Sequence, residues 1–536
     1  MNQHELSARY FRRRAERSAQ MRRAEDALFD AIVIGGGISG AAAFHELSRS
    51  GLRVALVEKG DFACATSQAS AMMIWGGLLY LCFGDLMAVQ SLSAGRDEMI
   101  RNLPGQVSAK RFVYLSRRNG GHPLWQAGLV LQLYWLMSGC SRMRPKRLKD
   151  PLHEFSFLRR EQFRAPLCYE EAAVAPSDCR FVLLLIASGR RDESPAFNYC
   201  QLMGGEFEEP RGLWRLEVED RISATRHTLR ARRVVNAAGL WADPLNRKMG
   251  VASSWRHVAA KGVFLGLKRL PGHRNTLIID SGDENTSFSL IPWGPVSLWG
   301  PTETVVSLPE DGFRVEPSDV RLLLDELHRH IGLRIGPADL VSIRCGVRPL
   351  PLKLGKPAPS RSIRLSRRYI LEPDRRRGWI TVYGGKFTGC RQMARRVARL
   401  LFRDLDASGE RGAEAAPESP PLEYFPGLAE PIPSALWCAE REMCWFLEDY
   451  LRRRTNVSQW LPRGGLGMRG ENVGHLNRIA GYFCPNPSRA ERMVDEYRSG
   501  VESSFDRLLA GFEKGSSDED VDVAEKPSGR SVLRRL

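Results

Sequence analysis

No two cysteines in the sequence are separated by two residues, and its histidines and cysteines follow no metal-ligand spacing. Zinc ribbons and thioredoxin-like redox centres are therefore not expected, and no metal site is predicted. The cysteines number 11, which is odd. Because a secreted disulfide framework normally pairs its cysteines, this usage favours a reducing compartment in which most thiols are buried and inert.

Long apolar segments are also missing. Residues 1–29 contain seven arginines and no apolar core, so this segment lacks the composition of a signal peptide. The uncharged segment from Pro123 to Cys140 is shorter than the run of about 20 apolar residues that a membrane span requires. We expect a cytoplasmic protein, which either stays in solution or touches the membrane surface from that side.

Acidic residues are in deficit. Lys and Arg total 79 against 62 Asp and Glu, which gives a formal charge of +17. Such a charge attracts nucleic acid, anionic lipid or acidic substrates, and an arginine-rich, solvated surface explains it equally well. Because the chain has no nucleic-acid-binding motif, nucleic acid is the least expected of these partners.

The strongest local signal lies between Asp30 and Gly60 of this 536-residue chain, which is long enough for about two or three domains. A short apolar run leads into the turn Gly35–Gly40, which has the pattern GxGxxG. A helix-forming stretch and a second apolar run follow, and the second run ends at Glu58. Strand, glycine turn, helix, strand and acid in this order are typical of a unit that binds a dinucleotide.

Each of these residues has a physical role in such a unit. Gly35 permits the tight turn, Gly37 lets the backbone approach a pyrophosphate, and Gly40 lets helix and strand pack closely. The free N–H groups at the start of the helix attract phosphate, and Glu58 accepts hydrogen bonds from a ribose. The unit alone does not distinguish FAD from NAD, although its place at the start of a long chain favours FAD.

Further motifs follow in a fixed order between about Asp30 and Trp460. They comprise 59–67, 74–81, 234–241, 261–262, 345–350 and 384–388, and residues around 451–455 are also similar. Together they resemble the FAD-dependent glycerol-3-phosphate dehydrogenases, a family of DAO-type flavoprotein oxidoreductases. The resemblance implies FAD as the cofactor and an α/β fold with a Rossmann-type FAD-binding domain, a mixed-sheet substrate domain and a C-terminal helical domain.

The glycine turn and the resemblance together predict the residues that bind FAD. They are Gly35, Gly37, Ile38, Ser39, Gly40, Glu58, Lys59, Ala65, Thr66, Ser67, Gly76, Gly77, Leu78, Ala237, Gly239, Gly384, Gly385, Lys386, Phe387 and Thr388. A helix expected from Phe387 to Leu405 would stabilise the negative charge of reduced flavin with its N-terminal N–H groups. An ordinary loop that begins a helix is the alternative for Gly384 and Gly385.

The resemblance implies that cations hold a phosphorylated alcohol at the substrate end of the site. It assigns this role to Arg348, Arg367 and Lys386, and it leaves Tyr80 as a hydrogen-bond donor. A guanidinium binds phosphate or carboxylate through two parallel hydrogen bonds, which positions the anion as well as attracting it. In a chain with 79 basic residues, a solvated surface charge is the alternative for each arginine.

Four positions depart from the family pattern, because apolar residues replace its polar ones. They are Met72, Trp75, Leu79 and Phe264. Either the pocket accepts a bulkier or less charged substrate, with Trp75 and Phe264 as apolar walls, or catalysis has been lost while FAD binding remains. Because Arg348 and Lys386 are present, we favour a working enzyme. His257 is a candidate displaced base, although an ordinary core or surface histidine explains it better.

The predicted domain organisation follows from these motifs and from composition. It consists of a basic arm at 1–29, a discontinuous FAD-binding domain at 30–105, 170–250 and 340–405, an insertion at 106–169, a substrate domain at 251–339, a linker at 406–433, a helical domain at 434–512 and a disordered tail at 513–536. Strands are expected at 276–279 and 287–291 within the substrate domain.

The insertion contains an apolar, aromatic segment from 123 to 140 that is followed by a group of cations, Arg142, Arg144, Lys146, Arg147 and Lys149. This pattern fits an interfacial membrane anchor, and a buried core or dimer helix fits it about equally well. Since the resembled family is membrane-peripheral, we lean towards peripheral membrane contact, and a homodimer is the alternative.

The leading functional prediction is an FAD-dependent dehydrogenase that transfers hydride from a small anionic or phosphorylated alcohol to FAD. An acceptor such as quinone or O2 would then take the electrons. An amine or amino-acid oxidase is the second reading of the sequence, since the lost polar residues change the substrate pocket. A non-catalytic flavoprotein that serves as a scaffold is the third.

Overall fold

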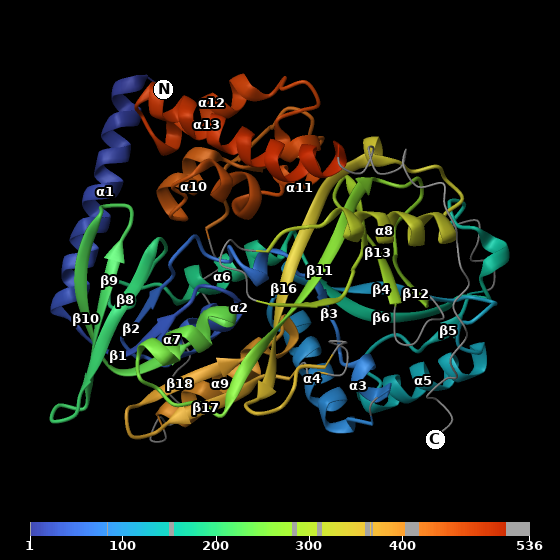
Figure 1. Cartoon of the computed structure of the whole chain (residues 1–536), viewed down its shortest axis with the longest axis horizontal. Coiled ribbons are helices and arrows are strands. Elements are labelled where there is room, and N and C mark those ends of the chain that lie inside the picture. The colour runs from blue at the N-terminus through green and yellow to red at the C-terminus, as the bar shows by residue number, and fades with distance from the viewer. Residues whose placement is uncertain are drawn as a thin grey trace.

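The computed structural model describes residues 2–82, 84–148, 155–280, 287–307, 313–359, 365, 368–402 and 418–510. Two large sheets lie side by side, and the C-terminal helices lie across the top of both in the view of Figure 1. The predicted class, an α/β protein with a Rossmann-type domain, a mixed sheet and a helical C-terminal region, is confirmed. Arg367, Lys149 and the tail 513–536 lie outside the described residues.

The first sheet has a parallel centre. Its strands are β1 (Leu28–Ile34), β2 (Val54–Val57), β7 (Ala196–Phe197), β8 (Cys200–Glu208), β9 (Leu213–Asp220), β10 (Thr225–Asn236), β17 (Ile370–Asp374) and β18 (Trp379–Tyr383). The order β18-β10-β1-β2-β7 is parallel throughout, and β17, β9 and β8 pair antiparallel at the margins. The Val- and Ile-rich runs that form β1 and β2 are buried on both faces, as parallel strands usually are.

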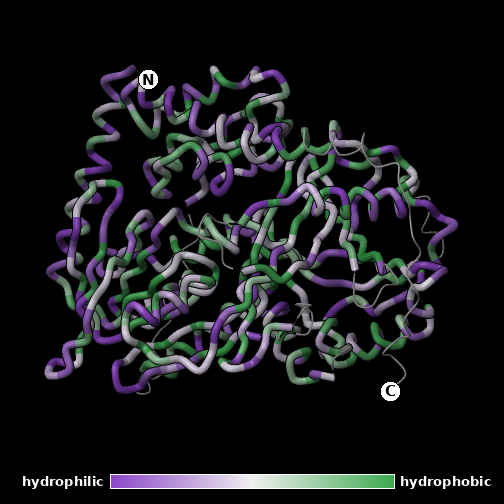
Figure 2. Tube along the Cα trace, in the orientation of Figure 1, coloured by the Kyte–Doolittle hydropathy of each residue, from purple (hydrophilic) through white to green (hydrophobic). Residues whose placement is uncertain are grey.

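Helices cover both faces of this sheet. Helices α2 (Ile38–Arg49), α6 (Asp178–Gly189) and α9 (Cys390–Leu401) pack together, while α1 (Gln3–Asp26) packs along β10. The tube of α1 is mostly hydrophilic in Figure 2, yet Met21 and Ala24 enter the core beneath the sheet. The basic N-terminal segment is therefore a docked helix. Helix α9 begins at Cys390, after a 3-10 turn at Phe387–Gly389, which is three residues later than predicted.

The second sheet is mixed. Its strands are β3 (Met73–Ile74), β4 (Val107–Ser116), β5 (Lys146–Arg147), β6 (Leu167–Val174), β11 (Trp255–Lys268), β12 (Thr276–Asp280), β13 (Ser287–Trp293), β14 (Val296–Gly300), β15 (Thr304–Val306) and β16 (Leu340–Lys353). Both strands expected at 276–279 and 287–291 are present as β12 and β13. Beyond the predicted 251–339, the sheet includes β4, β6 and β16, because β12 pairs with β4 and β16 pairs with β11 over nearly its whole length.

Helices flank the second sheet as well. Helices α3 (Leu78–Cys82), α4 (Leu86–Asn102) and α5 (Leu124–Met137) gather at its lower edge in Figure 1, and α8 (Pro317–His330) covers the opposite side. The core between α8 and the strands includes Leu323, Leu327 and Trp299. Within the described ranges, no helix combines the length and apolarity that crossing a bilayer requires.

The C-terminal region has a core of its own. This core is surrounded by helices α10 (Ala435–Arg441), α11 (Val457–Trp460), α12 (Val473–Phe483) and α13 (Pro487–Val501). A π-helical turn at Asp449–Arg454 and the small strands β19 (Leu422–Glu423) and β20 (Ile432–Pro433) complete it. Outside the C-terminal region, a further helix, α7 (Ala242–Lys248), follows strand β10 of the first sheet. Part of the predicted linker, 406–417, lies outside the described residues.

Candidate cofactor and active site

Four loops meet at one edge of the first sheet. Strands β1, β2, β10 and β18 run in the same direction, with Ile34 opposite both Val57 and Asn236 and with Asn236 opposite Thr381. Because these strands end at nearly the same level, the residues that follow them, Gly35, Glu58, Ala237 and Gly384, line the same edge. Ligands of open α/β sheets bind in the crevice at the carboxyl ends of the strands.

The glycine turn after β1 is closely packed. Gly35 has a φ of +104°, and a Cβ atom there would lie 2.6 Å from the carbonyl oxygen of Ala237. A Cβ atom on Gly40 would lie 1.8 Å from the carbonyl oxygen of Gly35, so neither position accepts a side chain. The N–H of Ile38, in the first turn of α2, donates to Ser67 Oγ at 2.9 Å. The first turn of α2 therefore faces the segment that contains Ser67.

Glu58 lies where β2 ends. Its carboxylate accepts hydrogen bonds from the N–H groups of Gly36 at 2.7 Å and Gly60 at 2.8 Å. Burial raises the pKa of this carboxyl group, and the two N–H donors oppose the rise. The next residue, Lys59, extends sideways, with its Nζ atom 3.6 Å from the centre of a Trp241 ring. Trp241 belongs to the short turn that begins at Gly239, so the loops after β2 and β10 touch through this pair.

The segment 65–69 lies between the glycine turn and the second sheet. Thr66 Oγ1 donates to the carbonyl oxygen of Val347 at 2.6 Å, and a Cβ atom on Gly346 would lie 2.7 Å from the Ala69 carbonyl oxygen. Because Val347 precedes Arg348 in β16, these contacts bring the predicted cofactor segment beside the predicted substrate strand. Ala65 forms the N-terminal end of the same short turn.

Gly76 is fixed by buried polar groups. Its N–H donates to Glu171 Oε2 at 3.0 Å, and its carbonyl oxygen accepts from Ser93 Oγ at 2.8 Å. Glu171 also accepts from Tyr134 Oη at 2.6 Å and from Arg96 at 2.9 Å, and burial raises its pKa. Gly77 follows with a φ of +102°, and α3 begins at Leu78. The sequence analysis did not identify Glu171 or Arg96, although a glutamate inside an apolar strand was a visible signal.

The loop after β18 touches four other segments. Gly384 donates its N–H to His257 Nε2 at 3.2 Å, and a Cβ atom there would meet Pro351 Cδ at 2.9 Å. A Cβ atom on Gly385 would lie 3.0 Å from Ser39 Oγ, in the first turn of α2. The Nζ atom of Lys386 lies 4.3 Å from the centre of the Tyr80 ring, and Phe387 and Thr388 then form the short turn before α9.

Arg348 extends across β11. Its NH2 atom lies 2.9 Å from the position that a Cβ atom on Gly262 would occupy, so a side chain there would displace the guanidinium. Its NH1 atom lies 3.3 Å from Glu303 Oε2, and both side chains are roughly one-quarter exposed, at 29% and 27%. Pro351, three residues later in β16, contacts Gly384. The segments of Gly76, Arg348 and Lys386 are thus linked by direct contacts, with Tyr80 joining the first to the third.

His257 has a positioning role in this arrangement. Its Nδ1 atom lies 3.2 Å from Asp243 Oδ1, and its Nε2 atom accepts from Gly384. With its proton on Nδ1, the ring therefore uses both nitrogens, and its side chain is fully buried. This geometry fits the core histidine of the sequence analysis and leaves neither nitrogen for a substrate hydroxyl group.

The four departures from the family pattern lie in different surroundings. Trp75 packs edge-on against Phe112 with ring centres 5.4 Å apart, and Phe264 is 4% exposed in a core that includes Trp293. Met72 is buried and has a φ of +55°, whereas Leu79 is 37% exposed on α3. Phe264 fills a hydrophobic core, and Trp75 packs partly buried against another. Their role as walls of a substrate pocket stays a prediction.

Comparison with known proteins identifies the family. A family model described as FAD dependent oxidoreductase matches residues 30–400. The chain belongs to this family. The family match confirms the prediction of an FAD-dependent oxidoreductase, and it includes all the loops at the carboxyl edge of the first sheet.

Two relatives of this FAD-dependent oxidoreductase are named as dehydrogenases of phosphorylated polyols. An aerobic glycerol-3-phosphate dehydrogenase of Staphylococcus haemolyticus is 25% identical over 383 residues, which are 70% of this chain and 67% of the relative. A D-erythritol 1-phosphate dehydrogenase of Brucella abortus is 26% identical over 403 residues, 74% and 78% of the two chains. The solved glycerol-3-phosphate dehydrogenase of Bacillus halodurans, complexed with FAD, has a TM-score of 0.70 at 20% identity, covering 92% of this chain and 98% of its own.

Proposed function

We propose that this FAD-dependent oxidoreductase removes hydride from an alcohol carbon of a small phosphorylated polyol. The observation that carries the proposal is the position of Lys386. Its ammonium group lies over the Tyr80 ring, on the same loop that reaches Ser39 in the first turn of α2. This position supports the proposal because an anionic substrate next to the cofactor would then lie within reach of a cation. The two relatives named for phosphorylated polyols support this substrate class.

The residues at the strand edge fit FAD. The N–H groups in the first turn of α2, beside Gly37, would bind the pyrophosphate, since a helix N-terminus favours anions. Glu58 keeps lone pairs for a ribose hydroxyl group beyond the two that its N–H donors use. A Cβ atom on Gly37 would meet Ser67 Oγ at 3.1 Å, so glycine at this position lets Ser67 lie close to the first turn of α2. FAD supplies the hydride acceptor when it is bound.

Arg348 and Lys386 would hold the anionic group of the substrate. Arg348 lies in β16 of the second sheet, and Lys386 lies in the loop after β18 of the first sheet. Together they would fix both the position and the orientation of a phosphate. Arg348 offers a planar pair of donors, and Lys386 offers a compact charge. Glu303, 3.3 Å from Arg348, would move away from an arriving phosphate because the two anions repel.

We also propose that α5 places the enzyme on an anionic membrane surface. Trp125, Leu129, Leu133 and Leu136 are 69%, 62%, 44% and 58% exposed on this helix, whose apolar segments are green in Figure 2. Exposed cations follow at Arg144, Lys146 and Arg147, whereas Arg142 is paired with Asp97. An apolar helix face beside cations suits an interface with anionic lipid. A membrane quinone would then be the nearest electron acceptor.

Anaerobic titration of the purified enzyme tests the substrate class. We expect the flavin absorbance to bleach with glycerol 3-phosphate or erythritol 1-phosphate, and not with glycerol or erythritol, which lack the anion. Bleaching by amines or amino acids alone would instead support an amine oxidase. Flavin that no alcohol or amine reduces would support the scaffold interpretation. Peroxide release compared with reduction of a soluble quinone then identifies the acceptor.

A further inference from the structure

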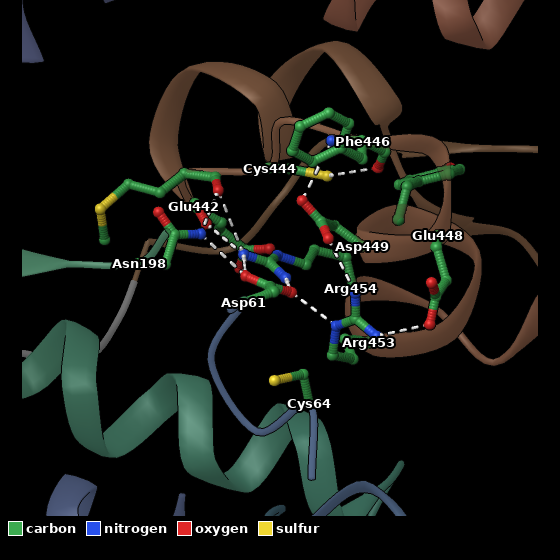
Figure 3. Close-up of polar contacts among 12 residues, drawn as sticks. Asp61, Cys64, Asn198, Glu442, Cys444, Phe446, Glu448, Asp449, Arg453 and Arg454 are labelled. Atoms are coloured by element: carbon green, nitrogen blue, oxygen red, sulfur yellow. Dashed lines mark hydrogen bonds and ion pairs between the residues drawn. The ribbon is translucent and has the colours of Figure 1, made fainter. Parts of the chain in front are cut away.

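Three consecutive arginines of the C-terminal region contact the loop that follows Glu58. Arg453 donates from Nε to Asp61 Oδ2 at 2.6 Å, and Arg454 donates to Asp61 Oδ1 at 3.0 Å and to Oδ2. Figure 3 shows Asp61 between these two guanidinium groups. Arg452 donates to the carbonyl oxygen of Gln68, and Arg453 reaches the side-chain oxygen of Gln68 at 3.2 Å. The three arginines thus form hydrogen bonds with both ends of the segment 61–68.

The charged side chains that make these contacts are buried. Asp61 is 1% exposed and Arg454 is fully buried. Burial would raise the pKa of the Asp61 carboxyl group, but Arg454 and Arg453 outweigh it and hold the pKa below its usual range. Asn198 completes the site by donating to Asp61 Oδ1 at 2.8 Å, and Asp449 accepts from Arg453 at 2.7 Å. A buried ion pair often stabilises a fold no better than packed apolar residues do. Stability alone therefore does not explain the ion pairs of Asp61 with Arg453 and Arg454.

The segment 61–68 borders the candidate FAD site. Ser67 receives the N–H of Ile38, Thr66 reaches Val347 in β16, and Glu58 lies just before Asp61. The segment has little regular structure beyond a 3-10 turn at Thr66–Gln68, so neighbouring elements must determine its path. Arg452, Arg453 and Arg454 supply fixed points at its two ends.

We propose that Arg452, Arg453 and Arg454 are positioning residues for FAD. Through Asp61 and Gln68 they hold Glu58 and Ser67 in place for the ribose and the pyrophosphate, without touching the cofactor. This inference rests on the proposed cofactor site, and it makes the C-terminal helical region a structural part of that site.

Arg452→Met provides the sharpest test. Burial lowers the pKa of Arg452 to about 10, with a further contribution from Arg344, so its charge is poorly compensated. Among the described residues its NH1 atom has no hydrogen-bond partner. We therefore expect the midpoint of unfolding of the methionine variant to lie at the same urea concentration as that of the wild type, or at a higher one. Its FAD should nevertheless leave the diluted holoenzyme at least tenfold faster, as followed by the rise in flavin fluorescence. A purely structural role would not separate these two readouts.

Arg454→Met and Arg180→Met form a matched pair. Arg180 on α6 also binds the C-terminal region, through Glu442 at 2.7 Å, but it is not among the residues that contact Asp61 or Gln68. We expect Arg454→Met to release FAD at least tenfold faster and Arg180→Met to release it at the wild-type rate. Equal release by Arg452→Met and the wild type would overturn the inference, as would equal acceleration in Arg180→Met. Wild-type enzyme that contains no FAD would instead overturn the proposed function.

Discussion

The ammonium group of Lys386 lies 4.3 Å from the centre of the Tyr80 ring, which joins the loop after β18 to helix α3. A cation over an aromatic face is attracted by about 0.5–2 kcal/mol, depending on desolvation. The ring therefore holds the cation in place before any substrate arrives, and less side-chain freedom is lost on binding.

Lys386→Met should weaken binding of a phosphorylated substrate. A hydrogen bond to a charged group contributes about 1.5–3 kcal/mol, so we expect KM to rise by roughly tenfold to a hundredfold. Steady-state kinetics with a polyol phosphate measure this change. Lys356→Met, at an exposed position, is the control and should leave KM unchanged. Equal KM values for Lys386→Met and the wild type would remove Lys386 from the substrate site.

Glu171→Gln should destabilise the fold. The variant leaves Arg96 buried with only part of its compensation, and removing one partner of a buried pair costs about 3–5 kcal/mol. Urea unfolding measures the loss. Glu170→Gln changes the neighbouring residue of the same strand, which is partly exposed, and should cost less than about 1 kcal/mol. Similar losses in both variants would contradict a stabilising role for the buried Glu171–Arg96 pair.

Gly384→Ala should impair catalysis more than it impairs folding. The φ of +68° strains any side chain, and a Cβ atom would also meet Pro351 and the carbonyl oxygen of Arg368 at 3.0 Å. The loop must shift, and Lys386 moves with it. We expect kcat/KM to fall at least tenfold. Gly355→Ala has a similar φ of +80°, and no atom of the described residues lies within 4 Å of its Cβ position. It should therefore show the backbone strain of about 1–2 kcal/mol and no kinetic change.

His45 should make the enzyme acid-sensitive. Burial, helped by Arg391 and Arg49, lowers the pKa of this imidazole from 6.5 to about 4. Between these two values the unfolded chain binds a proton that the folded chain does not, so the free energy of unfolding falls as pH falls. The loss is at most about 3 kcal/mol, at about 1.4 kcal/mol per pKa unit. His45→Leu should flatten this slope in urea unfolding, whereas His4→Leu, at an exposed position, should keep it.

Helix α5 should bind vesicles that contain anionic lipid. Burial of one leucine side chain contributes about 1.5–3 kcal/mol, so Leu129→Lys should lower the partition coefficient at least tenfold in co-sedimentation. Leu322→Lys alters a leucine that is 48% exposed on α8 and should bind as the wild type does. If Leu129→Lys disrupts a dimer and leaves vesicle binding intact, the exposed face is a contact between two copies of the chain.

Local patterns predicted the elements whose causes are local. The GxGxxG turn requires glycine at Gly35 because its φ is +104°, and at Gly40 because a Cβ atom there would meet the carbonyl oxygen of Gly35. Both reasons are local, and α2 and β2 follow the turn at the expected places. The strands β12 and β13 were recognisable from alternation and composition. The ordered motifs gave the family, which the match over 30–400 confirms.

Long-range pairing was not predictable from these patterns. Nothing in the composition of β16 indicates that it pairs with β11 in the second sheet, because strand order depends on partners far away in the chain. The contacts of Glu171 with Gly76, and of His257 with Gly384, likewise join residues separated by 95 and 127 positions. The predicted site residues Tyr80 and Lys386 came from family motifs, but their mutual contact appears only in the folded chain.

The pairing of Asp61 with Arg454 spans 393 positions and crosses the end of the region that the family model matches. A recombinant fragment cut at residue 400 would contain the whole of the family match. It would nevertheless lack Arg453 and Arg454, the two cations that pair with the Asp61 carboxylate. The family match therefore ends before the residues that complete the buried surroundings of Asp61.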